Sequence, residues 1–89
     1  MTTLMLKVDN PATGEVAAEV ALTGPHQLDA VVARARTAQR EIVSWSLDQR
    51  IELCRRWVTA FEARAEHMAE DITRQMGKPL AQSRGEIKG

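Results

Sequence analysis

The chain has 89 residues with twelve basic and twelve acidic side chains, so it has no net field to attract nucleic acid or an anionic membrane. Only three residues are aromatic and one is cysteine, which limits the core and excludes an intrachain disulfide. The sequence contains neither a signal-peptide pattern nor an apolar run long enough to span a bilayer. Together these features predict a cytoplasmic protein that binds neither nucleic acid nor membrane.

The first predicted element is a β-hairpin over residues 4–20. Leu4–Val8 is short, apolar and β-prone, and Glu15–Val20 resumes an extended pattern. Between them, Asp9–Gly14 is dense in turn-forming residues. Two isolated strands are marginal in water, so we expect the hairpin to lie on the helices that follow.

Two long helices are predicted next, over residues 25–43 and 47–76. The first opens with a proline, and its apolar residues recur at helical spacing. The second has a hydroxyl cap at Ser46, with Gln49 placed to complete a capping box, and Gly77 marks its end. Because the link between them is short, we expect the two helices to be antiparallel and to share a seam.

The second of these helices would be about 45 Å long. A globule of this chain length would have a diameter of only roughly 30 Å. The helix must therefore protrude, bend, or pack on protein that these residues do not supply, and we favour the last. A further helix begins over residues 79–89, and its pattern is unfinished at Gly89. The sequence thus predicts a mostly helical segment and no complete domain.

Few residues are candidates for chemistry. Cys54 falls on the apolar stripe of the second helix, so we interpret it as a buried small hydrophobe and not as a nucleophile. His67 is expected on an exposed helix face, and His26 lies in the first turn of a helix; two lone histidines do not make a metal site. The phosphate-binding patterns GxGxxG and GxxxxGK(S/T) do not occur. The sequence predicts no catalytic, cofactor-binding or metal-binding residue.

Several short motifs nevertheless suggest a family. In chain order they are Asn10–Val16 (NPATGEV), Leu28–Ala35, Trp45, Arg50, Leu53 with Cys54, Gly77–Leu80 and Gly85–Ile87. Their order and spacing resemble the N-terminal segment of the aldehyde dehydrogenase superfamily. The stretch Met76–Ile87 leans toward the branch that includes succinate-semialdehyde dehydrogenases.

This resemblance implies an α/β family fold, of which residues 1–89 are the N-terminal part of the cofactor-binding domain. It also implies the oxidation of an aldehyde to a carboxylic acid with NAD or NADP. In the family a cysteine thiolate, a glutamate-activated water and the dinucleotide-binding loop carry this reaction, and all lie downstream of the matching segment. Cys54 does not match the catalytic cysteine. The implied partners are the remainder of the dehydrogenase chain and further copies in a homo-oligomer.

We therefore expect this segment to be an inactive scaffold of a dehydrogenase. The alternative is a free-standing helical interaction module whose apolar stripe docks a partner helix. The aldehyde, the choice between NAD and NADP and the oligomeric state depend on residues outside the segment.

Overall fold

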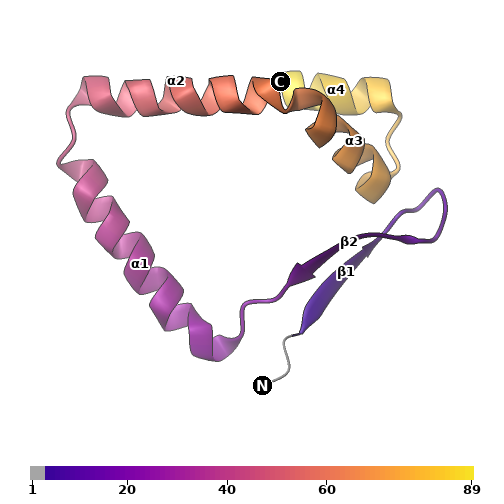
Figure 1. Cartoon of the computed structure of the whole chain (residues 1–89), viewed down its shortest axis with the longest axis horizontal. Coiled ribbons are helices and arrows are strands. Elements are labelled where there is room, and N and C mark those ends of the chain that lie inside the picture. The colour runs from indigo at the N-terminus through magenta and orange to yellow at the C-terminus, as the bar shows by residue number, and fades with distance from the viewer. Residues whose placement is uncertain (1–3) are drawn as a thin grey trace. The chain divides into compact units, whose positions relative to one another are not determined.

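The computed structural model describes residues 4–89. Their elements in chain order are β1 (Met5–Asp9), β2 (Val16–Ala21), α1 (Pro25–Val43), α2 (Leu47–Ala63), α3 (Ala65–Met76) and α4 (Leu80–Lys88), as Figure 1 shows. They form two compact units. Of the described residues, one unit combines 4–22 with Thr59–Gly89, and the other is Thr23–Val58.

Strands β1 and β2 pair in antiparallel fashion, which confirms the predicted hairpin. Met5 lies opposite Ala21 and Val8 opposite Ala18, with an irregularity in register between Val8 and Asp9. In the connecting turn the Asn10 side-chain oxygen accepts the Ala12 N–H at 2.9 Å, and the Asn10 carbonyl accepts the Gly14 N–H at 2.7 Å. Gly14 has φ +77°, a left-handed conformation that glycine adopts without strain. The turn is therefore closed by its own residues.

Helix α3 is the centre of the first unit, since it packs on α4 and also contacts both strands. Ala69 of α3 and Ser83 of α4 are completely buried, and no other described residue is classed as buried. Both side chains are small, which lets the two helices approach closely. The hairpin thus lies on a helix, as expected, and the core of the unit is narrow.

The expected single helix over residues 47–76 is wrong, because the structure divides it at Arg64. Arg64 has φ −110° and ψ 10°, outside helical geometry, and ends α2 while capping α3. Its N–H bonds to the Phe61 carbonyl at 3.1 Å, a tightened last turn, and its own carbonyl accepts the Met68 N–H at 3.0 Å. Of the three possibilities for the overlong helix, bending occurs at Arg64. Packing on further protein, the possibility that we favour, stays a prediction. Figure 1 shows the interruption between the end of α2 and the start of α3.

The helix ends follow the predicted capping chemistry. Ser46 Oγ accepts the Gln49 N–H at 3.1 Å while Gln49 Oε1 accepts the Ser46 N–H at 2.9 Å, so the capping box is formed. Gly77 closes α3 with φ +80°, and its N–H bonds to the Thr73 carbonyl at 2.9 Å. The last helix, α4, starts directly after Pro79.

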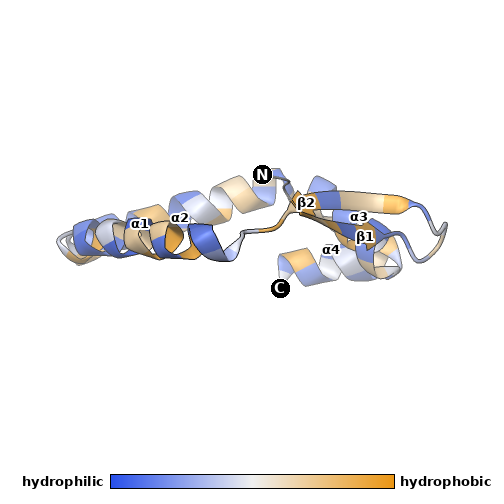
Figure 2. Ribbon diagram, turned by 90° about the horizontal axis from the view of Figure 1, so that it is seen from below, coloured by the Kyte–Doolittle hydropathy of each residue, from blue (hydrophilic) through white to orange (hydrophobic). Residues whose placement is uncertain are grey.

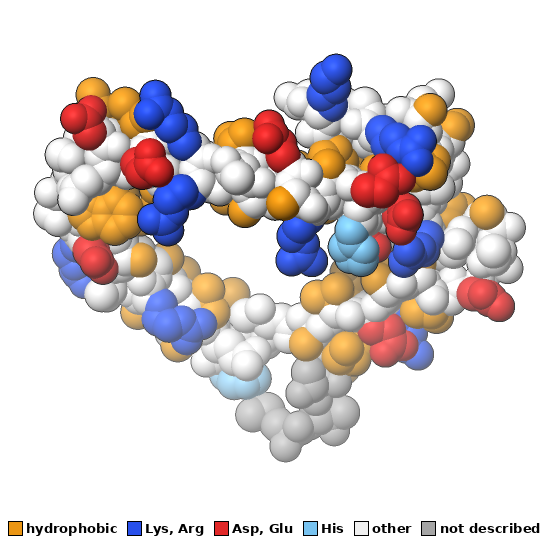
Figure 3. Space-filling view, turned by 45° about the horizontal axis from the view of Figure 1, so that its top comes forward, with side chains coloured by type: hydrophobic (Ala, Val, Ile, Leu, Met, Phe, Trp, Pro, Cys, Tyr) orange, Lys and Arg blue, Asp and Glu red, His pale blue; other side chains and the backbone are white. Residues whose placement is uncertain are grey.

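In the second unit no side chain is buried, and apart from Gly24 and Trp45 every residue of Thr23–Val58 is exposed. Leu28 is 50% exposed and Val32 is 48% exposed. Helix α1 and the first part of α2 diverge from the corner that contains Trp45 (Figure 1), so the expected seam between their stripes is not formed. Figure 3 shows hydrophobic side chains lying among charged ones on the molecular surface.

Candidate functional site

Cys54, the one thiol, is exposed on α2, so the expectation that it is buried is wrong. The physical reason is that the apolar stripe to which it belongs has no cover within Thr23–Val58. Exposure alone does not make a thiol a nucleophile, which also needs a base or a lowered pKa. The absence of a catalytic role for Cys54 stays a prediction.

The two histidines lie on helix surfaces. His67 Nε2 is 3.4 Å from Asp71 Oδ2 one turn further along α3; the His67 side chain is 59% exposed and the Asp71 side chain 40%. His26 borders a shallow depression at the start of α1 that is also lined by Thr23, Gln27, Ala30, Val31 and Arg34. Every one of these side chains is exposed, so the depression has no buried polar group to position a ligand.

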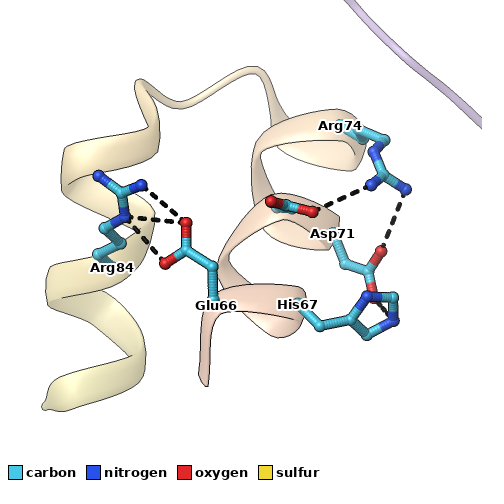
Figure 4. A network of polar contacts seen from close by, with 6 residues as sticks. Glu66, His67, Asp71, Arg74 and Arg84 are labelled. Carbon is cyan, nitrogen blue, oxygen red and sulfur yellow. Dashed lines mark hydrogen bonds and ion pairs between the residues drawn. The ribbon is translucent and has the colours of Figure 1, made fainter. Parts of the chain in front are cut away.

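The charged side chains of α3 form a network that Figure 4 shows from close by. Arg74 lies 3.4 Å from Glu70, as the spacing of these residues predicts, and 3.5 Å from Asp71. One turn before Glu70, Glu66 faces Arg84 of α4 (Figure 4). Arg84 donates from Nε to Glu66 Oε2 at 3.0 Å and from Nη2 to Oε1 at 2.7 Å, a two-point contact between helices.

The Glu66–Arg84 pair shifts the proton affinity of both groups. Hydrogen bonds from Arg84 lower the pKa of the Glu66 carboxyl, against a smaller opposing effect of desolvation. The same bonds raise the pKa of the Arg84 guanidinium. Both side chains are more than half exposed, so water screens the attraction between them. The pair therefore helps to orient α3 and α4 but contributes little to the free energy of folding.

Two further contacts fix α4 on α3. The hydroxyl groups of Thr73 and Ser83 lie 2.8 Å apart and satisfy each other at the narrow core. Lys78, in the link between the helices, donates to Glu86 of α4. Sequence reasoning found neither these contacts nor the Glu66–Arg84 pair. The only sequence feature that could have indicated these contacts is the short Gly77–Pro79 link, because helices joined by so few residues are usually neighbours.

The turn of the hairpin contacts the end of α3. A Cβ built on Gly77 would lie 2.8 Å from Pro11 Cγ, so this glycine leaves room for the proline ring. The contact joins Asn10–Gly14 to Gly77–Pro79, two of the motifs that carry the family resemblance. Glu86, which pairs with Lys78, belongs to the third motif, Gly85–Ile87. These motifs therefore meet in one structural cluster.

The described residues contain no group of three or more His, Cys, Asp or Glu side chains placed to hold a metal ion. Within the same part of the chain, no helix combines the length and apolarity that crossing a membrane requires. A second shallow depression, on the surface at Trp45 and Leu53, is lined mostly by exposed side chains. The contacts described above are structural: they hold α3, α4 and the turn of the hairpin together.

Comparison with known proteins identifies the family. Residues 2–89 match the aldehyde dehydrogenase family. The chain belongs to the aldehyde dehydrogenase family. The resemblance stated from the motifs is thereby confirmed, including its lean toward succinate-semialdehyde dehydrogenases.

Three relatives of this family member act, by their names, on semialdehydes. The chain is 36% identical over 85 residues to the mitochondrial succinate-semialdehyde dehydrogenase of Arabidopsis thaliana, covering 92% of this chain and 16% of the relative. It is 37% identical over 78 residues to the succinate semialdehyde dehydrogenase (NAD(P)+) Sad of Escherichia coli (strain K12), covering 88% and 17%. It is also 37% identical over 76 residues to a 3-succinoylsemialdehyde-pyridine dehydrogenase of a Pseudomonas species, covering 85% and 16%. The chain therefore spans about one sixth of the length of these relatives.

Proposed function

We propose that this aldehyde dehydrogenase family member is the N-terminal part of an enzyme that oxidises a semialdehyde to the corresponding carboxylic acid with NAD or NADP. The observation that carries the proposal is the match over residues 2–89, which covers one sixth of relatives named for semialdehydes. The names of the Arabidopsis and Escherichia coli relatives make succinate semialdehyde the first substrate to test.

The segment itself is proposed to be a scaffold without activity. Its motifs make structural contacts: Pro11 packs on Gly77, and Lys78 pairs with Glu86. Two observations support the absence of a dinucleotide site in the segment: both depressions described above are lined mostly by exposed side chains, and no glycine-rich turn leads into a helix among the described residues. The nucleophile, the water-activating group and the cofactor site are therefore assigned to the remainder of the dehydrogenase chain.

The deciding experiment combines an intact-mass measurement with an activity assay on the protein isolated from its own cells. We expect a mass several-fold above 9.9 kDa, together with NAD(P)H formation from succinate semialdehyde. The 89-residue chain produced alone should form no NAD(P)H. Activity of the short chain that Cys54→Ser abolishes would refute the scaffold role. A full-size protein that oxidises no aldehyde would refute the enzyme.

The uncovered stripe of α1 and α2 supports a second candidate, a free-standing helical module that docks a partner helix. It requires a cellular product close to 9.9 kDa. It also requires the chain alone to unfold cooperatively or to oligomerise with rising concentration. A chain that binds ANS and unfolds without cooperativity counts against it. A cytoplasmic location is a further expectation, which rests on the composition. A homo-oligomeric dehydrogenase is another, which rests on the family resemblance.

A further inference from the structure

We draw no further inference here: the strongest candidate, the apolar face of the β-hairpin on which Leu4, Leu6, Val20 and Leu22 are each about half exposed or more, in strands whose ribbon contains hydrophobic residues in Figure 2, carries nothing because nothing in the structure shows what covers it.

Discussion

Gly77 meets two separate constraints at the end of α3. Its φ of +80° is left-handed, which costs a residue with a side chain about 1–2 kcal/mol. Its missing Cβ also leaves space for Pro11, whose Cγ would lie at 2.8 Å from that atom. We therefore expect Gly77→Ala to lower the unfolding free energy by about 2 kcal/mol, measured from the urea midpoint by circular dichroism.

Gly85 provides the matched control, since it lies inside α4 and a Cβ built on it meets nothing within 4 Å. Gly85→Ala should raise the unfolding free energy by about 0.5–1 kcal/mol because alanine is the better helix former. Equal effects of the two substitutions would contradict the special role of Gly77.

The Glu66–Arg84 pair makes a prediction about pH. The pKa of Glu66 is lower in the folded than in the unfolded chain, so the pair stabilises the fold fully above the ordinary glutamate pKa. This stabilisation is lost as the pH falls through the lowered pKa. Glu66→Gln should therefore lower the urea midpoint at about pH 7 and reduce its drop between about pH 7 and about pH 3. Arg84 stays charged over this range because its pKa is raised.

The control for this prediction is Glu62→Gln, which removes a carboxylate one turn earlier, in α2. No ion pair of Glu62 occurs among the described residues. The control variant should keep the pH dependence of the unmodified chain. A pH profile that is the same with and without Glu66 would show that the pair contributes nothing measurable.

At the scale of elements, the contact between α3 and α4 depends on small side chains. Ala69 is completely buried, and Thr73, one turn further along the same helix, bonds Ser83 of α4. A leucine at position 69 has no space without separating the helices. We expect Ala69→Leu to lower the unfolding free energy by about 1–3 kcal/mol and to increase ANS binding.

Ala33→Leu tests whether this effect is due to packing and not to the residue type. Ala33 is exposed in the middle of α1, and leucine is nearly as good a helix former as alanine. The control should change the unfolding free energy by no more than about 0.5 kcal/mol. If Ala69→Leu were equally harmless, the narrow core would not hold α3 and α4 together.

Elements whose signals are local could be predicted from the sequence. The Ser46–Gln49 capping box, the glycine end of α3 and the turn after Asp9 each depend on residues within a few positions. The break at Arg64 could not be predicted in this way, because no glycine or proline lies near it in the sequence. Packing of α3 on α4 and both strands accompanies it, and such packing acts between residues far apart in sequence.

Among the polar contacts too, those between residues close in sequence were predictable and those between distant residues were not. The Glu70–Arg74 pair was predictable because its residues are one helical turn apart. Glu66 and Arg84 are 18 positions apart, and the charge pattern of each helix alone does not select this partner. The exposure of Cys54 was missed because the hydrophobic pattern indicates which side chains share a face, but not whether a partner for that face is present.

At the scale of the whole chain, the two units differ in the interactions that stabilise them. The first has a buried centre at Ala69 and Ser83 with hydrogen bonds and ion pairs across it. The second, Thr23–Val58, has no buried side chain, so α1 depends on its own backbone bonds and caps. In proteins most of the stability of a helix comes from the packing of its apolar face, and within Thr23–Val58 α1 has no such packing. The two units should therefore open with different free energies.

Amide hydrogen exchange followed by mass spectrometry measures this difference. Peptides from Pro25–Val43 should exchange at least about tenfold faster, relative to the unfolded chain, than peptides from Ala65–Met76, because every tenfold step in opening is about 1.4 kcal/mol. The same peptides in urea supply the reference rates, and a dilution series tests whether self-association covers the stripe. Equal protection of both helices at every dilution would mean that α1 is stabilised within one chain. Fast exchange of α1 in the short chain, and slow exchange in a full-size dehydrogenase, would identify the missing cover as the rest of that protein.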